Sequence, residues 1–278
     1  MNNQTTSPYE VRGQYDAEGY CVARNVLDPD LIHEASDHID WLLKNNPGLR
    51  PEQLHNDLMR EDAFWVRLIS DDRLLDIAEQ FIGPNIALFA SHYISKRPFD
   101  GQAVLWHQDG SYWPLQPMQV VSLWLAVDDS TPENGCLRVV PGSQMMTIHP
   151  THKRDDVDNV LGSAMDTALV DESQAVDVRM KAGDVEIHHP NLIHGSNANT
   201  SPRRRAGLTI RYIPTTTRII TEKQWPSAFL LRGSAVPGVN DYLPFPACSE
   251  GKSMTFRGWE EWNSTRAGRA RISAAIGV

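Results

Sequence analysis

The periodicity of the apolar residues changes once along the chain, at Gly83-Pro84. Before this point they recur at helical spacing, as in a segment that Asp28-Pro29 would begin and in one that Ser70 would begin. A short strand is expected between helices at 20–23. After Pro84, short β-branched and aromatic runs alternate with turn signals, which is typical of strands. These predicted strands span 86–94, 120–127, 137–140, 175–178, 185–189 and 207–213.

Many short strands without long helices between them predict a mainly β fold with N-terminal helices, built from antiparallel sheets packed as a sandwich or barrel. We expect one domain over 1–278: mostly helical support in 1–85, the sheet core in 86–215 and a C-terminal extension in 216–278. A polar, Asp-rich loop is inserted at 145–173. Loops of this length are usually functional or disordered.

Charge and hydropathy exclude several classes of function. The chain has 35 acidic and 26 basic residues, and a net charge of -9 disfavours binding to nucleic acid phosphates. No apolar run approaches the roughly 20 residues that span a bilayer. The polar N-terminus does not resemble a secretory signal, and three cysteines make no disulfide framework. We therefore expect a cytoplasmic protein without membrane or nucleic acid partners; the sequence predicts no oligomeric state.

The strongest local motif is Trp106-His107-Gln108-Asp109. In extended chain, residues i and i+2 project to one side, so His107 and Asp109 could bind the same metal ion. His194 is the candidate third ligand. Two histidines and one carboxylate leave open coordination positions, as a non-haem Fe(II) oxygenase requires. A single H-x-D motif is also common in surface loops, so this reading needs a further signal.

Arg205 provides that signal, eleven residues after His194 and across a turn-rich segment at 197–202. If the segment forms a hairpin, His194 and Arg205 are cross-strand neighbours. An arginine buried beside a metal needs an anionic partner. A dicarboxylate co-substrate would bind the metal at one end and the guanidinium at the other. The preceding Arg203 and Arg204 are expected at the solvated surface.

The combined motifs resemble the phytanoyl-CoA dioxygenase family of Fe(II)/2-oxoglutarate-dependent oxygenases. The similarity covers about residues 10–215, in the order of the family. The matching segments are Gln14-Tyr15-Asp16, Glu18-Gly19-Tyr20, Gly83-Pro84-Asn85-Ile86, Trp106-His107-Gln108-Asp109, Tyr112-Trp113-Pro114, Ser122-Leu123-Trp124, Glu133 to Leu137, Pro141-Gly142-Ser143, Ala182-Gly183-Asp184, Leu192 to Ser196 and Arg205.

The resemblance implies a double-stranded β-helix, or jelly-roll, core similar to that of cupins. It implies Fe(II) ligation by His107, Asp109 and His194, and binding of the distal 2-oxoglutarate carboxylate by Arg205. Related halogenases have a small residue in place of the carboxylate, so the presence of Asp109 implies hydroxylation or another oxidation instead of halogenation.

Three further residues fall at positions that contact 2-oxoglutarate in the family. Ser196 and Trp124 match positions that line the co-substrate pocket, and His92 matches a strand position that often contacts it. Each also has a structural alternative: turn capping for Ser196, core packing for Trp124 and a hydrogen-bonded core position for His92. His188 and His189 would face opposite sides of a strand, so at most one of them points inward.

The expected activity is oxidation of a free small molecule by O2 with release of succinate and CO2. The substrate classes suggested by the family are natural-product intermediates, compatible solutes and aminoalkylphosphonates. Two alternatives remain: a non-enzymatic jelly-roll binding protein, and a zinc-dependent hydrolase or isomerase on a cupin-like barrel.

Overall fold

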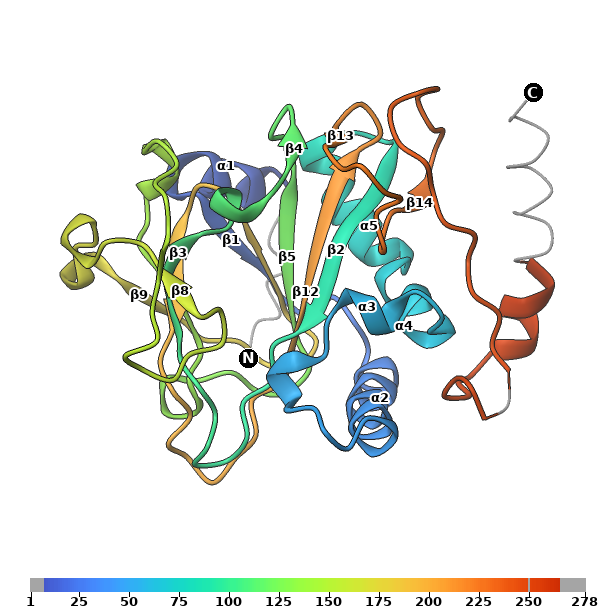
Figure 1. Ribbon diagram of the computed structural model, residues 1–278, viewed down its shortest axis with the longest axis horizontal. Coiled ribbons are helices and arrows are strands. Elements are labelled where there is room, and N and C mark those ends of the chain that lie inside the picture. Colours follow the sequence, from blue (N-terminus) through green and yellow to red (C-terminus); the bar gives the residue numbers. More distant parts are fainter. Residues whose placement is uncertain (1–7, 250, 266–278) are drawn as a thin grey trace.

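The computed structural model describes residues 8–249 and 251–265 (Figure 1). Most of the helices precede the core strands along the chain. They are α1 (Pro8–Glu18), α2 (Pro29–Asn45), η1 (Pro51–Gln53), α3 (Asn56–Met59), α4 (Ala63–Ile69) and α5 (Asp72–Ile82). Short 3-10 turns follow between strands: η2 (Asp109–Tyr112), η3 (Pro132–Asn134), η4 (Ser143–Met145), η5 (Thr167–Leu169) and η6 (Glu172–Gln174). No helix among the described residues is both long and apolar enough to cross a membrane.

Two antiparallel sheets form the core. The larger has the strand order β1 (Tyr20–Ala23), β10 (Val185–His188), β5 (Val121–Ala126), β12 (Gly207–Pro214), β2 (Ile86–Tyr93) and β14 (Phe229–Arg232). The smaller has the order β3 (Val104–Gln108), β11 (Ile193–Ser196), β6 (Leu137–Val139) and β9 (Val176–Val178). Two minor ribbons pair β4 (Leu115–Gln116) with β13 (Arg218–Ile219), and β7 (His152–Lys153) with β8 (Ser163–Ala164).

The molecule has three layers, with the six-stranded sheet between the helices and the four-stranded sheet (Figure 1). The side chains of strand β12 show why this sheet is covered on both faces. Its apolar residues Leu208, Ile210 and Tyr212 belong to the main core with residues of α2, α4 and α5. Successive side chains of a strand alternate between faces, so Thr209 and Arg211 project toward the other sheet and line the cavity between the sheets. One strand thus contributes apolar residues to the main core and polar residues to the cavity.

The predicted fold class is confirmed: antiparallel sheets with jelly-roll strand order, braced by N-terminal helices. The helix boundaries are partly as expected. Asp28 caps α2, because its carboxylate accepts a hydrogen bond from the backbone N–H of Leu31 at 3.0 Å. Ser70 does not begin α5. It ends α4 by donating to the carbonyl of Arg67, and Asp71 caps α5 instead. The sequence Ser7-Pro8-Tyr9-Glu10 also predicts a capping box, but Ser7 lies outside the described residues.

The expected hairpin between His194 and Arg205 is wrong. β11 belongs to the four-stranded sheet and β12 to the six-stranded sheet, so the intervening segment crosses between sheets. His194 pairs instead with His107 and Val139, and the backbone of Arg205 bridges to Lys96. The ten-residue connection is long enough to pass from one sheet to the other, which its turn residues alone do not reveal.

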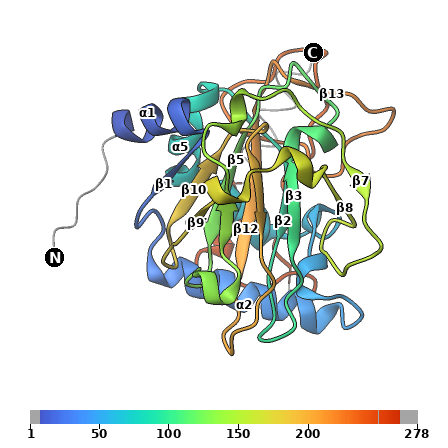
Figure 2. The same ribbon diagram turned by 90° about the vertical axis from the view of Figure 1, so that its left-hand side faces the viewer.

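The inserted loop, and the C-terminal extension in the part that the structure describes, both contain more regular structure than the sequence suggests. The loop contains the β7–β8 ribbon and lies alongside β3 (Figure 2), where Met165 donates its N–H to the carbonyl of Trp106 at 2.9 Å. In the C-terminal extension, β14 extends the larger sheet beside β2. Farther along, the rings of Phe245 and Trp262 stack with their centroids 5.6 Å apart.

Candidate metal and co-substrate site

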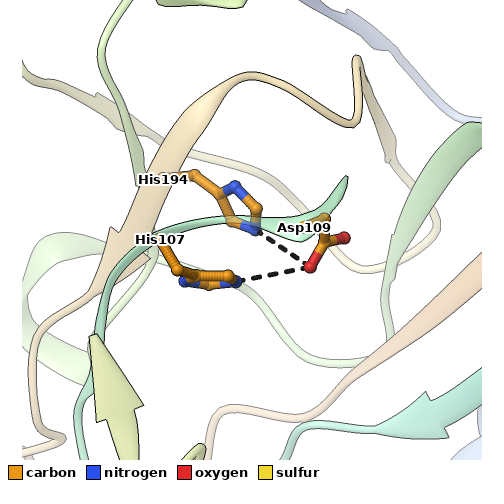
Figure 3. Close-up of side chains that lie close together, drawn as sticks. All are labelled: His107, Asp109 and His194. Atoms are coloured by element: carbon orange, nitrogen blue, oxygen red, sulfur yellow. Dashed lines mark ion pairs between the residues drawn. The ribbon is translucent and has the colours of Figure 1, made fainter. Parts of the chain in front are cut away.

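Three predicted ligands converge between the two sheets. His107 on β3 and His194 on β11 are cross-strand partners, and their ring centroids lie 4.1 Å apart. Asp109 begins the 3-10 turn that directly follows β3. The side chains of all three are buried and point toward one another (Figure 3). Their ligand atoms all lie within 4.8 Å of one another, as a shared metal ion requires.

The donor atoms fit a metal ion. Asp109 Oδ1 is 3.4 Å from His107 Nε2 and 3.9 Å from His194 Nε2. Ligand atoms bonded at about 2.1 Å and at right angles are roughly 3 Å apart, so each of these two distances would need to shorten by under about 1 Å around a bound ion. The Nδ1 atoms of His107 and His194 lie 2.8 and 3.0 Å from the carbonyls of Leu105 and Leu192. Donation to these carbonyls leaves both Nε2 lone pairs free for a metal.

The second oxygen of Asp109 is surrounded by donors. Oδ2 lies 3.5 Å from each of Ser122 Oγ, His188 Nε2 and Arg211 Nη2. Burial alone would raise the pKa of Asp109, but the Arg211 charge and hydrogen bonds with His107 and His188 hold it well below its usual range. Asp109 is therefore a carboxylate at neutral pH, with Oδ1 directed to the metal position.

The electrostatics also favour neutral His194. Burial, followed by the neighbouring His107, lowers the pKa of the imidazole well below its usual value. A neutral imidazole is the form that binds a metal. His194 thus offers a neutral nitrogen and Asp109 an anionic oxygen, and with Nε2 of His107 they form a donor set suited to ferrous iron.

The sequence reasoning did not identify a role for His188 and Glu186. Both lie on the site-facing side of β10, with His188 Nδ1 2.8 Å from Glu186 Oε2. Burial lowers the pKa of His188, but Glu186 and then Asp109 outweigh it and raise the value to about 9. The alternation in Val185-Glu186-Ile187-His188 was a usable signal, since Val185 and Ile187 enter the helix-covered core. As predicted, only one of the two adjacent histidines contacts the site.

Arg205 lies in the same cavity as the three ligands, although it approaches from the larger sheet. It is only 2% exposed, and its Nη1 donates to the carbonyl of Ile94 at 2.8 Å. Its Nε has no partner, and no described carboxylate lies within ion-pair distance of the guanidinium. Burial lowers its pKa to about 10, so it remains charged at neutral pH. A buried cation without a counter-ion calls for an anionic ligand.

Ser196 and Lys96 lie beside this guanidinium. Lys96 is fully buried, and its ammonium donates to Ser196 Oγ at 2.7 Å and to the carbonyl of Asn197. Burial and then the charge of Arg205 lower the pKa of Lys96 well below its usual range. Ser196 also lines the cavity. No local motif in the sequence marked Lys96 as part of this cluster.

Trp124 forms a wall of the same cavity. The guanidinium of Arg205 lies 5.3 Å from the centre of its ring. Gly207 allows this packing, because a Cβ there would lie 2.0 Å from a ring atom of Trp124.

His92 lines the cavity through a different contact. Its Nδ1 lies 2.9 Å from Arg211 Nη1, and burial followed by the Arg211 charge lowers its pKa well below the usual value. Nδ1 of the neutral ring accepts from the guanidinium.

The structure therefore brings all seven predicted site residues to one cavity: His92, His107, Asp109, Trp124, His194, Ser196 and Arg205. The other two arginines of the basic run differ from each other. Arg203 is exposed, as expected. Arg204 is not simply solvated, since its Nε lies 2.8 Å from Asp128 Oδ2.

Known proteins share this sequence and fold. Phytanoyl-CoA dioxygenase 1 from Oryza sativa subsp. japonica is 36% identical over 129 residues, which cover 46% of this chain and 45% of that relative. L-Proline trans-4-hydroxylase from Streptomyces griseoviridis is 31% identical over 169 residues, 54% of this chain and 63% of its own. The chain thus spans about half to two thirds of these relatives.

Solved structures with the same fold are more distant in sequence. The apo form of the non-heme monooxygenase ThoJ superposes with a TM-score of 0.73 at 20% identity, covering 96% of this chain and 98% of its own. The structure of EctD from S. alaskensis with 2-oxoglutarate and 5-hydroxyectoine has a TM-score of 0.62 at 22% identity, covering 87% of this chain and 90% of the EctD chain.

The family model for phytanoyl-CoA dioxygenase (PhyH) matches residues 15–207, which include all three candidate metal ligands and Arg205. That match extends over more than half of the chain and over most of both sheets. The chain belongs to the phytanoyl-CoA dioxygenase (PhyH) family.

Proposed function

We propose that this protein is an Fe(II)- and 2-oxoglutarate-dependent dioxygenase that hydroxylates a C–H bond of a free small molecule. The observation that carries the proposal is one cavity holding two features together. The first is the set of His107 Nε2, His194 Nε2 and Asp109 Oδ1, and the second is Arg205, a buried cation without a counter-ion.

A bound ferrous ion would activate O2 in a reaction coupled to decarboxylation of 2-oxoglutarate to succinate and CO2. The residues of the chain hold and orient the reactants. His107, Asp109 and His194 would hold the metal, and a set of three protein ligands would leave positions for the 2-oxo acid and O2. Arg205 and Ser196 bind the distal carboxylate, and Trp124 excludes water from that end of the cavity.

Arg205 also separates this proposal from its alternatives. A zinc-dependent hydrolase or isomerase needs three ligands and a water, but no buried cation for a dicarboxylate. A binding protein with a decayed metal site would not need both Nε2 atoms kept free by backbone acceptors. The three candidate ligands and the unpaired Arg205 together support a site for a metal and a 2-oxo dicarboxylate.

The substrate class is inferred from the relatives and from the charge of the chain. The relatives include enzymes named for a free amino acid, L-proline, and for ectoine. We propose a free small molecule for this chain too: a natural-product intermediate, a compatible solute or an aminoalkylphosphonate. The acidic net charge of -9 disfavours a large polyanionic acyl-CoA ester.

Anaerobic titration tests the reaction type before any substrate is known. Protein with Fe(II) should develop a weak visible charge-transfer band when 2-oxoglutarate is added, and Asp109→Ala should not. A succinate-release screen in air across candidate substrates then tests the substrate class. Turnover that needs neither O2 nor 2-oxoglutarate would exclude the proposal in favour of the zinc enzyme.

A further inference from the structure

We infer that the cavity contains a second carboxylate-binding position, at Arg211, which binds an anionic group of the primary substrate. This inference rests on the proposed function and narrows its substrate class to small molecules that carry a carboxylate or a similar oxyanion. It concerns a different guanidinium from the one assigned to 2-oxoglutarate.

Arg211 is held rigidly by neutral groups. Its Nη1 donates to Thr209 Oγ1 at 2.7 Å and to His92 Nδ1 at 2.9 Å. Its guanidinium lies 5.5 Å from the centre of the Trp113 ring. The residue is 7% exposed and lines the cavity between the sheets. A cation fixed in this way is preorganised for a ligand, because little side-chain entropy remains to be lost on binding.

Two donors of Arg211 remain underused. Nε has no hydrogen-bond partner, and the single contact of Nη2 is Asp109 Oδ2 at a long 3.5 Å. Nε and Nη2 lie on the same edge of a guanidinium, where their two N–H groups point in parallel. That edge matches the spacing of the two oxygens of a carboxylate. The free edge of Arg211 is thus the part shaped for bidentate recognition.

The charges of the loaded site leave Arg211 without a counter-ion. A bound ferrous ion would balance the charges of Asp109 and of the proximal 2-oxoglutarate carboxylate, and Arg205 would pair with the distal carboxylate. Glu186 has a partner of its own, since its Oε2 lies 2.8 Å from His188 Nδ1. Among the described residues, the only carboxylate within ion-pair distance of Arg211 is Asp109. An anionic substrate would restore the balance inside a buried site, where an uncompensated charge is costly.

The two arginines lie in different parts of the cavity. They are six positions apart along the chain, and their guanidinium groups have different neighbours: Trp124 for Arg205, and Thr209 and His92 for Arg211. Arg211 lies at the Asp109 side of the metal position, and Arg205 lies beside Ser196. A substrate carboxylate on Arg211 would therefore hold the rest of a small molecule next to the metal.

The test uses the full-length protein with Fe(II) and saturating 2-oxoglutarate under anaerobic conditions. Acetate, methylphosphonate and the neutral acetamide are titrated separately, while visible absorption and circular dichroism follow the Fe(II)·2-oxoglutarate band. Wild type, Arg211→Gln and Arg211→Lys are compared. Arg203→Gln, which changes an exposed arginine, is the matched control.

We expect acetate or methylphosphonate to shift the band in the wild type and in Arg203→Gln, whereas acetamide does not. Hydrogen bonds to charged groups contribute about 1.5–3 kcal/mol, so Arg211→Gln should weaken anion binding about tenfold or more. The increase in the dissociation constant of 2-oxoglutarate should be much smaller. Arg211→Lys should recover part of the anion affinity, because lysine keeps the positive charge but lacks the two parallel N–H donors of the guanidinium.

Three results would overturn the inference. Equal effects of acetate and acetamide would show that charge is not recognised. Loss of the band on adding acetate would show competition with 2-oxoglutarate at Arg205 instead. Equal losses of anion affinity and of 2-oxoglutarate affinity in Arg211→Gln would indicate that Arg211 only positions Asp109 and does not bind the substrate. Absence of any band in the wild type is a different outcome, because it refutes the proposed function itself.

Discussion

Replacement of Arg205 by glutamine should separate binding of the co-substrate from binding of the metal. The guanidinium is 2% exposed and has no protein carboxylate to pair with, so its charge is available to the ligand. Removing one partner of a buried, hydrogen-bonded charge pair costs about 2–5 kcal/mol. Since 1.4 kcal/mol corresponds to a factor of ten, the dissociation constant of 2-oxoglutarate should rise about 30-fold or more.

The assay is anaerobic titration of the Fe(II)-loaded protein with 2-oxoglutarate, followed through the visible band. Iron affinity is measured separately, by competition with a chelator, and should change little in Arg205→Gln because Arg205 contacts none of the three ligands. Arg203→Gln controls for the loss of a neighbouring positive charge at the surface. A 2-oxoglutarate dissociation constant within about threefold of wild type in Arg205→Gln would refute the reasoning.

Three other substitutions, at Asp109, Gly207 and His188, test separate parts of the structure, and Gly13→Ala is the control for Gly207→Ala. Asp109→Ala should abolish succinate release and weaken Fe(II) binding, and wild-type turnover in this variant would remove Asp109 from the ligand set. Gly207→Ala should lower the free energy of unfolding in urea by about 1–3 kcal/mol, because its Cβ would overlap the ring of Trp124. Gly13→Ala, with nothing within 4 Å of the new Cβ, should not destabilise, and equal effects of the two would contradict the packing argument. In the metal-free protein, a folded-state pKa of about 9 for His188, against about 6.5 unfolded, gives stability that is complete below pH 6.5 and is lost as the pH rises through 9. His188→Gln should remove that decline in urea midpoint, and a parallel pH dependence of both proteins would count against the assignment.

Most strands of the core could be predicted, because their apolar residues follow a local period. The strands β3 and β11, which carry two of the candidate ligands, and β14 were not predicted as strands. Those predicted after Pro84 agree with β2, β5, β6, β9, β10 and β12 to within one or two residues at each end. The sheet to which each strand belongs could not be predicted in the same way. Whether the segment after His194 turns back or crosses over depends on contacts with β3 and β6, which are distant in the sequence.

The candidate site was predictable to the extent that residue type and spacing carry chemistry. Two histidines and a carboxylate, such as His107, Asp109 and His194, are a typical set of metal ligands. Arg205 could be added because it is a basic residue close to His194 in the sequence. Lys96 has no such local signature, because its role depends on a bridge to Arg205 that forms only in the folded chain. The seven predicted residues share one cavity, while their roles as ligands remain predictions for the experiments above.

The alternation along β12 restricts which genetic changes this strand can accept. Leu208, Ile210 and Tyr212 face the helices, whereas Thr209 and Arg211 face the cavity. A single-residue deletion near Gly207 would exchange the two sets, placing a guanidinium in the hydrocarbon core and leucine or isoleucine at the metal. We therefore expect insertions and deletions to be far more damaging in this strand than conservative substitutions, and its length to be preserved even where its residues vary.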